Sequence, residues 1–216
     1  MSVEKDLRKH RRHYESGSIG RGNLDPNPFM QFGRWLQESI DMAAIDATAM
    51  TLATATSDGI PSARIVLLKQ YDELGFCWYT DSRSQKGQEL ANNAQATLLF
   101  YWREMNRQVR IQGSVEQLSA QDAEAYFNSR PDGSRFSAAA SCQSSLVEKR
   151  AELEDEVRRL RELYPQGDVP RPASWIGYRL KPVYFEFWQG LVNRLHDRLV
   201  YRPTTENGWS IERISP

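Results

Sequence analysis

Short stretches of alternating apolar and polar residues, separated by tight turns, constrain this chain more than any other feature of its sequence. The segment Arg107–Gln117 is the clearest case: Val109, Ile111 and Val115 alternate with polar side chains. A period of two places one set of side chains on one face of a β-strand, where it can be buried. The segment therefore predicts a half-buried strand, and the Ser57-Asp58-Gly59 turn indicates how neighbouring strands reverse.

Further segments of this kind punctuate the chain, with a few helical stretches between them. The predicted strands are Ala49–Thr56, Ser62–Lys69, Phe76–Thr80, Thr97–Trp102, Ile176–Leu180, Val183–Gln189, Arg198–Tyr201 and Trp209–Ile214. The predicted helices begin near Pro28, Ser84, Ser119 and a capping-box pattern formed by Ser145 and Glu148. Many short antiparallel strands with few helices predict a mainly β fold of the α+β class, arranged as a closed or nearly closed barrel.

The length of 216 residues fits one sizeable domain, and no linker-like stretch divides it. We expect a single domain over 25–216, preceded by a mobile polar segment over 1–24. That segment carries a basic run, Arg8–His13, for which a solvated tail is the ordinary interpretation. The alternative is a flap that closes on an anionic ligand.

The composition excludes several functional classes. Lys plus Arg and Asp plus Glu both number 28, so a formal net charge of zero gives no support for nucleic-acid or membrane binding. Two cysteines and three histidines predict neither a disulfide framework nor a metal site. No apolar run is long enough to span a membrane, and the polar N-terminus lacks a signal-peptide pattern. A cytoplasmic location is therefore expected. The chain contains no glycine-rich nucleotide-binding fingerprint, so a Rossmann fold has no support.

Two positions could bind a phosphate, although each has an ordinary structural explanation. Lys86 lies at a predicted helix start, where free N–H groups and the helix dipole favour anions, but serine and lysine are also common capping residues. Lys69 shares a strand face with Ile65 and Leu67; a lysine that reaches water is the favoured interpretation of that stretch alone, and a cation over a pocket is the alternative.

Tyr126 and Arg130 lie four residues apart on one predicted helix, shortly before Ser134. Together they suit a phosphomonoester, and a packed tyrosine with a capping arginine is an equally good interpretation. Gln108 could offer an amide donor and acceptor to a flavin-like ring edge, or form a cross-strand polar pair.

Near the C-terminus, Arg194, His196 and Arg198 alternate along a predicted strand, so all three should point the same way. Three cationic or potentially cationic groups on one face repel one another, and a fold keeps such a row most readily against an anion or an electron-rich ligand. An exposed strand face is the weaker alternative, because Trp188 and other apolar residues surround the row. We expect the three side chains to project into a ligand cavity.

These motifs and several others resemble those of the pyridoxine/pyridoxamine 5′-phosphate oxidase family. They occur in the family's order along nearly the whole chain. The matching landmarks are Arg64–Lys69, Tyr79-Thr80, Lys86-Gly87, Phe100-Tyr101-Trp102, Asn106–Arg110, Tyr126–Pro131, Gln143-Ser144-Ser145, Val169-Pro170-Arg171-Pro172, Glu186–Gly190 and Asn193–Arg198. The resemblance implies a split β-barrel that works as a homodimer, with FMN at the subunit interface.

The resemblance also assigns roles to individual residues. The positions implied to bind FMN are Arg64, Val66, Leu67, Lys69, Tyr79, Thr80, Lys86, Gln108, Gln143, Ser144, Trp188 and Arg198. The substrate phosphate is implied to contact Lys69, Tyr126, Arg130 and Ser134. The catalytic residues implied to flank the pyridine ring are Arg194 and His196, and the N-terminal flap is implied to contain Arg11 and Tyr14.

The chain departs from the family pattern in three places. Gln85 stands where the family usually has arginine, which removes one cation from the FMN phosphate site. Ser134-Arg135-Phe136-Ser137 replaces a usual Ser-Gln-Ile-Gly, and Cys142 replaces a residue that is often basic.

The reaction implied by the resemblance is oxidation of pyridoxine or pyridoxamine 5′-phosphate to pyridoxal 5′-phosphate, by hydride transfer from C4′ to N5 of FMN. Dioxygen then accepts the electrons and becomes hydrogen peroxide. Three alternatives remain. The first is a related flavin oxidase of the same fold that acts on another substrate, as in phenazine biosynthesis. The others are a non-catalytic protein that binds FMN or pyridoxal phosphate, and a purely structural barrel that binds no flavin.

Overall fold

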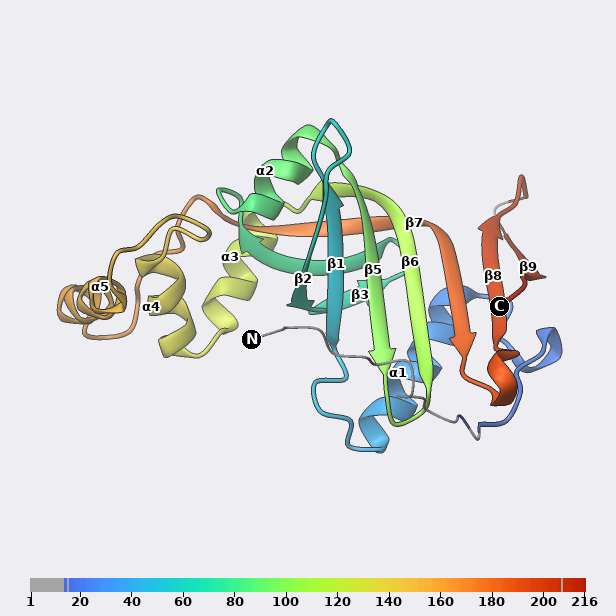
Figure 1. The fold of residues 1–216 in the computed structure, drawn as a ribbon. Coiled ribbons are helices and arrows are strands. Elements are labelled where there is room, and N and C mark those ends of the chain that lie inside the picture. The colour runs from blue at the N-terminus through green and yellow to red at the C-terminus, as the bar shows by residue number, and fades with distance from the viewer. Residues whose placement is uncertain (1–13, 15, 207) are drawn as a thin grey trace, which may run out of the picture. The chain divides into compact units, whose positions relative to one another are not determined.

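The computed structural model describes residues 14, 16–206 and 208–216, which form five α-helices, two short 3-10 helices and nine strands (Figure 1). The helices are α1 (Pro28–Asp41), α2 (Gln85–Asn92), α3 (Ala120–Ser129), α4 (Asp132–Ala140), α5 (Arg150–Leu163), η1 (Arg21–Asn23) and η2 (Val192–Arg194). The strands are β1 (Ala49–Ala55), β2 (Pro61–Leu67), β3 (Gln70–Asp72), β4 (Gly75–Asp81), β5 (Gln95–Trp102), β6 (Arg107–Gln117), β7 (Trp175–Gln189), β8 (Asp197–Pro203) and β9 (Trp209–Arg213).

Hydrogen bonds join the strands in the order β2-β1-β5-β6-β7-β4-β3, with β8 paired to β7 and β9 paired to β8. Every pairing whose register is described is antiparallel; Met50 lies opposite Val66, for example, and Leu52 opposite Arg64. An antiparallel sheet with separate helices confirms the predicted α+β class.

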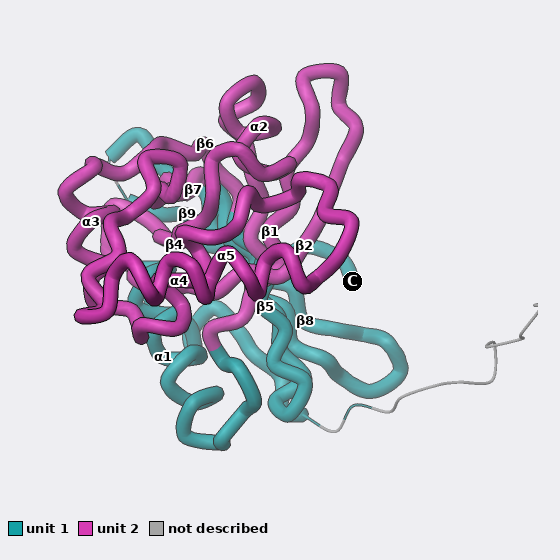
Figure 2. The backbone as a smooth tube through the Cα atoms, turned by 90° about the vertical axis from the view of Figure 1, so that its left-hand side faces the viewer, with its two compact units in different colours: residues 1–47, 99–111, 184–216 teal, residues 48–98, 112–183 magenta. Residues whose placement is uncertain are grey.

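The described residues fall into two compact units, each assembled from separate stretches of the chain (Figure 2). Unit 1 comprises the described residues up to 47 together with 99–111 and 184–216, and unit 2 comprises 48–98 and 112–183. Three of the four changes of unit fall inside strands β5, β6 and β7, and none coincides with a flexible linker.

Aromatic rings fill the core of unit 1. Phe32 and Phe100 pack edge to face with ring centroids 4.9 Å apart, and Trp35 meets Phe187 in the same way at 5.1 Å. Helix α1 buries Phe32 and Trp35 together because residues three apart share one helix face. The Asn27 side chain caps the start of this helix by accepting a hydrogen bond from the Phe29 backbone N–H. The helix predicted to begin near Pro28 is thus confirmed.

Unit 2 has a sheet core and a second cluster beneath its helices. Strand β1 alternates between buried and half-buried side chains, so Met50 and Leu52 lie in the core as its two-residue period predicts. The second cluster contains the buried residues Phe127, Phe136, Leu160, Val169 and Trp175, contributed by α3, α4, α5, the loop after α5 and the start of β7. This cluster fixes the three helices beside strand β4, which carries part of the site described below.

The structure corrects three predicted elements. The Ser145–Glu148 capping box is wrong: α5 begins at Arg150, and its N-cap residue Lys149 forms no side-chain cap. Helix α4 was not predicted at all. The two strands predicted on either side of Pro182 are one strand, β7, which pairs with β4 up to Leu180 and with β8 from Phe185.

Pro182 lies in β7 between the segment that pairs with β4 and the segment that pairs with β8, so its missing N–H removes no hydrogen bond to either of these two strands. Strand β6 approaches the same point closely. A Cβ atom on Gly113 would lie only 1.9 Å from the Lys181 carbonyl oxygen, so this position requires glycine.

Candidate functional site

A large open pocket of about 1240 Å³ lies in unit 2. Strands β2 and β4, helices α2 to α5 and the loop after α4 supply its lining. The lining includes nine of the positions predicted to bind FMN, which are Arg64, Val66, Leu67, Lys69, Tyr79, Thr80, Lys86, Gln143 and Ser144. It also includes the four predicted phosphate contacts Lys69, Tyr126, Arg130 and Ser134. The structure therefore brings together residues up to 80 positions apart in the sequence.

Lys86 is the central cation of this pocket, although only 7% of its surface is exposed. Its Nζ donates to Gln143 Oε1 at 2.7 Å and lies within hydrogen-bond distance of Thr80 Oγ1 at 3.2 Å and Ser84 Oγ at 3.3 Å. Among the described residues, no carboxylate forms an ion pair with it. Burial, and then repulsion by Arg64, lowers the pKa of Lys86, as expected for a charge that lacks a counter-ion.

The start of helix α2 holds this lysine in place. Ser84 caps the helix, because its Oγ accepts a hydrogen bond from the Gly87 backbone N–H. A Cβ atom on Gly87 would lie 2.3 Å from the Ser82 carbonyl oxygen, so glycine allows the preceding loop to fold tightly against the helix. The Gln85 backbone N–H reaches Ser144 Oγ at 3.3 Å, which joins the helix start to the loop after α4.

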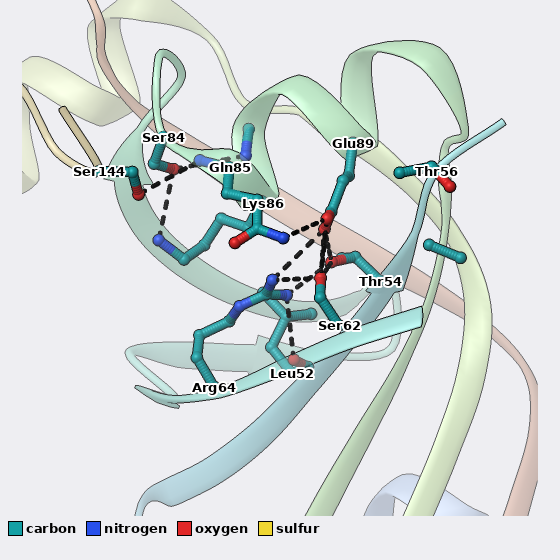
Figure 3. Close-up of polar contacts among 12 residues, drawn as sticks. Leu52, Thr54, Thr56, Ser62, Arg64, Ser84, Gln85, Lys86, Glu89 and Ser144 are labelled. Atoms are coloured by element: carbon teal, nitrogen blue, oxygen red, sulfur yellow. Dashed lines mark hydrogen bonds and ion pairs between the residues drawn. The ribbon is translucent and has the colours of Figure 1, made fainter. Parts of the chain in front are cut away.

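Arg64 projects from strand β2 toward the same region, where Glu89 of α2 holds it (Figure 3). The Glu89 carboxylate accepts hydrogen bonds from Thr54 and Ser62, and its Oε2 lies 3.3 Å from Arg64 Nη2. Burial alone would raise the pKa of Glu89, but these hydrogen bonds, that of Gln85 and the charge of Arg64 lower it to about 2. Glu89 is therefore ionised and orients the arginine.

The opposite end of the pocket is aromatic and carries a second, half-buried cation. The Arg130 guanidinium carbon lies 4.9 Å from the centre of the Trp175 ring, and Tyr126 stacks on Tyr79 with centroids 4.2 Å apart. Arg130 Nη1 is buried and forms no hydrogen bond with any described residue. Burial lowers the pKa of Arg130. A buried donor without a partner is costly unless a ligand satisfies it, so this atom marks where an anion fits.

Lys69 is exposed at the rim of the pocket, two residues beyond the end of β2. Its backbone N–H bonds to the Cys77 carbonyl oxygen at 2.9 Å, which fixes the backbone while leaving the side chain in the lining. The prediction that Lys69 continues the strand is wrong by two residues.

The remaining predicted site residues that the structure describes lie in unit 1. His196 packs against Trp188, with ring centroids 4.7 Å apart, and Tyr14 contacts both rings edge to face. A Cβ atom on Gly190 would lie 2.7 Å from the Tyr14 ring, so glycine is needed for Tyr14 to pack there. Gln108 is half-buried on β6, and Arg11 lies outside the described residues.

The prediction that Arg194, His196 and Arg198 alternate along one strand is wrong. Arg194 ends the short helix η2 with a φ of 65°, and β8 begins only at Asp197. The consecutive left-handed residues Asn193 and Arg194 break the extended backbone that a two-residue period requires. Arg194 is consequently exposed, while His196 and Arg198 are half-buried.

His196 and Arg198 have defined partners in unit 1. The Leu191 backbone N–H donates to His196 Nδ1 at 3.0 Å, and burial followed by repulsion from Arg194 lowers the pKa of His196. Arg198 Nε donates to Glu186 Oε1 at 2.7 Å, and Arg110 Nη2 donates to Glu186 Oε2 at 2.5 Å. Burial acts to raise the pKa of Glu186, but its bonds to the two arginines lower it.

Sequence reasoning missed Arg161 and Trp175, which line the pocket, and Glu89, which pairs with the lining residue Arg64. The four-residue spacing places Gln85 and Glu89 on one face of the helix, but it does not reveal that the acid faces Arg64. Trp175 and Arg161 lie beyond the predicted site residues of the pocket along the chain, and no local pattern links them to those residues. No described helix is long and apolar enough to cross a membrane, and the described residues contain no cluster of His, Cys, Asp and Glu suited to a metal ion.

Two family profiles match the chain. Residues 36–164 match a profile described as pyridoxamine 5′-phosphate oxidase. Residues 175–216 match one described as the pyridoxine 5′-phosphate oxidase C-terminal dimerisation region.

Full-length relatives carry a consistent name. The chain is 51% identical over 216 residues to the pyridoxine/pyridoxamine 5′-phosphate oxidase of Paraburkholderia phymatum, and the match covers 100% of both chains. It is 49% identical over 211 residues to the protein of that name from Cyanothece sp., covering 98% of this chain and 97% of the relative.

Solved structures agree in fold. PhzG from Burkholderia lata, in complex with tetrahydrophenazine-1-carboxylic acid, superposes with a TM-score of 0.86 at 31% identity, covering 93% of this chain and 99% of that one. A pyridoxamine 5′-phosphate oxidase-related, FMN binding protein from Nostoc punctiforme has a TM-score of 0.69 at 18% identity, covering 89% and 100%, and supports the fold alone. The profiles, the full-length identities and the shared fold together show that this chain belongs to the pyridoxamine 5′-phosphate oxidase family.

Proposed function

We propose that the protein oxidises pyridoxine 5′-phosphate or pyridoxamine 5′-phosphate to pyridoxal 5′-phosphate, with FMN as cofactor, O₂ as electron acceptor and H₂O₂ as product. The observation that carries this proposal is the composition of the unit 2 pocket. It gathers every position expected to bind FMN except Gln108, Trp188 and Arg198, together with all four residues expected at the substrate phosphate.

The phosphate of FMN fits the end of the pocket at helix α2. Lys86 is a buried cation that contacts only neutral oxygens there, and Arg64 adds a second positive charge in a fixed orientation. A phosphate would supply the counter-charge that Lys86 lacks, and the positive dipole end of α2 favours an anion at the same place. Lys86, Arg64, Thr80, Gln143 and Ser144 are the residues that would hold it.

The pocket also has room for a second ligand. Its volume of about 1240 Å³ exceeds the roughly 300–1,000 Å³ of typical single-ligand pockets. At the aromatic end, Arg130 offers an unsatisfied buried donor beside Tyr126 and Ser134. A phosphomonoester would satisfy this donor, which supports a phosphorylated substrate over a neutral one.

Bound FMN would supply the chemistry itself, by accepting a hydride at N5 and passing the electrons to dioxygen. The protein would hold the substrate through Arg130, Ser134 and Tyr126, and position it against the flavin. His196 accepts a hydrogen bond at Nδ1, so its neutral form carries the proton at Nε2 and can donate it to a substrate oxygen or nitrogen. Arg194 would orient the pyridine ring and stabilise negative charge that develops on it.

We also propose that the active form is a homodimer with FMN at the subunit interface, working in the cytoplasm. The match of residues 175–216 to a dimerisation region supports the dimer. The free thiols of Cys77 and Cys142 fit a reducing compartment.

Oxygen uptake by FMN-loaded protein, with each phosphate added in turn and H₂O₂ measured in parallel, tests this function. We expect O₂ consumption and H₂O₂ formation in equal amounts, and rapid bleaching of the flavin when substrate is added without oxygen. Turnover of tetrahydrophenazine-1-carboxylic acid but of neither phosphate would instead indicate the related oxidase. Flavin binding with bleaching too slow to support turnover would indicate a storage or sensing protein.

A further inference from the structure

Arg161 on helix α5 differs from the other arginines of that helix. Arg150, Arg158 and Arg159 each pair with a carboxylate three or four residues away on the same helix. The positions three and four residues from Arg161 hold Val157, Arg158, Tyr164 and Pro165, so no acid lies on its face of the helix. Arg161 also forms no ion pair with any other described residue. Its charge is therefore uncompensated within the described part of the protein.

This uncompensated cation lines the unit 2 pocket, beside the substrate end of the site. Its guanidinium carbon lies 5.5 Å from the centre of the buried Phe136 ring, which holds the side chain over α4. Its Nη2 lies 4.0 Å from where a Cβ atom would stand on Gly133, the residue before Ser134. Arg161 thus reaches the first turn of α4.

The charges around that turn leave Arg161 available to a ligand. Asp132 is the acid of the turn, but Arg135 forms an ion pair with it. Arg130, which precedes the turn, has a buried Nη1 without a partner. Two arginines therefore approach the same turn, and neither has a carboxylate of the described protein as its partner.

We propose that Arg161 selects the substrate, by contributing a second arginine to recognition of its phosphate group. This inference rests on the proposed function and deepens it. A phosphomonoester carries close to two negative charges and three acceptor oxygens at neutral pH, so a second guanidinium adds charge and hydrogen bonds to those that Arg130 and Lys69 would supply. A substrate with a hydroxyl group in place of the phosphate, or with a single carboxylate, gains less from the second guanidinium.

The test compares Arg161→Met, which keeps an apolar side chain over Phe136, with Arg161→Lys, which keeps the charge. Arg158→Gln is the matched control, because it removes an exposed arginine from the same helix. For FMN-loaded protein, we expect Arg161→Met to raise the KM for pyridoxine 5′-phosphate about 5- to 20-fold, with kcat changed less than about twofold. Arg161→Lys should restore part of the loss, and Arg158→Gln should match the unaltered protein.

A binding measurement separates this inference from the proposed function. Calorimetry with 4′-deoxypyridoxine 5′-phosphate, which has no hydroxyl group to oxidise, should show the same 5- to 20-fold loss in Arg161→Met. Binding of FMN and of unphosphorylated 4′-deoxypyridoxine should not change. An unaltered Kd for the phosphate ester, or an equal loss for the unphosphorylated compound, would overturn the role of Arg161. Failure of the unaltered protein to oxidise either phosphate would overturn the function, even where the binding difference is present.

Discussion

The Lys86 ammonium donates a 2.7 Å hydrogen bond to Gln143 Oε1, and so links the first turn of α2 to the loop after α4. Both residues line the pocket, and the bond holds a buried cation at its α2 end without a counter-charge. A site of this kind is prepared for an anion before the anion arrives, which reduces the cost of ordering on binding.

Replacing Lys86 should therefore affect cofactor binding more than folding. We expect Lys86→Met to raise the Kd for FMN about 10- to 100-fold, because a charge-assisted hydrogen bond to phosphate is lost. Stability should not fall, because the substitution also removes a buried charge. Flavin fluorescence quenching on apoprotein and urea unfolding measure the two effects. Lys149→Met, at an exposed position, is the control, and an unchanged FMN Kd in Lys86→Met would contradict the assignment.

Gln85 offers the converse experiment, because the residue stands where the resemblance implies an arginine. Its Nε2 now donates to Glu89 Oε1 at 2.9 Å. We expect Gln85→Arg to tighten FMN binding about 3- to 10-fold at low salt, with the gain shrinking as ionic strength rises. Gln88→Arg adds the same charge at an exposed position of the same helix and should have a smaller effect. An unchanged Kd for FMN would show that the new arginine forms an ion pair with Glu89 and not with the phosphate.

Glu89 should make stability depend on pH. Its pKa in the folded protein, about 2, lies below the ordinary value of 4.5. Its contribution to the free energy of unfolding is therefore full above pH 4.5 and is lost as the pH falls toward 2. We expect Glu89→Gln to lower the free energy of unfolding by up to about 3 kcal/mol at pH 6, and by much less near pH 3. Urea unfolding across this range measures the difference. The exposed Glu73→Gln should show neither effect.

The protonation of His196 can be followed directly by NMR. Its pKa is lowered by burial and by Arg194, so its titration midpoint should lie below 6.5. Protonation also breaks the bond that Nδ1 accepts from the Leu191 N–H. We expect Arg194→Gln to raise the midpoint, because it removes the repelling charge, while Arg202→Gln leaves it in place. A midpoint at or above 6.5 in the unaltered protein would refute this environment for the ring.

Arg194→Ala tests the catalytic assignment. The side chain is exposed and carries no structural partner among the described residues, so we expect stability to be retained. Turnover of pyridoxine 5′-phosphate should fall by about 10²-fold or more, with FMN binding largely spared. Stopped-flow flavin reduction and FMN titration separate the two effects. Normal turnover in this variant would show that Arg194 does not act on the pyridine ring.

Local pattern was enough to predict most of the elements. Strand β1 was predicted over Ala49–Thr56 and is observed over Ala49–Ala55, because a two-residue period and a following turn are properties of the nearby chain. Helices α2 and α3 are capped by Ser84 and Ser119, as expected for side chains that satisfy free N–H groups. Helix α4 was missed because a short segment rich in serine and alanine has no strong apolar period.

By itself, the sequence determined the α+β class, the family and the chemical types of the residues at the site. The tertiary structure alone decided which of those residues meet: Lys86 with Gln143, Glu89 with Arg64, and Arg130 with Trp175. The tertiary structure also places Arg194 outside the strand, because Asn193 and Arg194 have left-handed backbone angles that the spacing of apolar residues does not predict. The reason is physical: strand and helix periods arise from neighbouring residues, whereas burial of a charge and the partners it keeps depend on contacts between segments far apart in the chain.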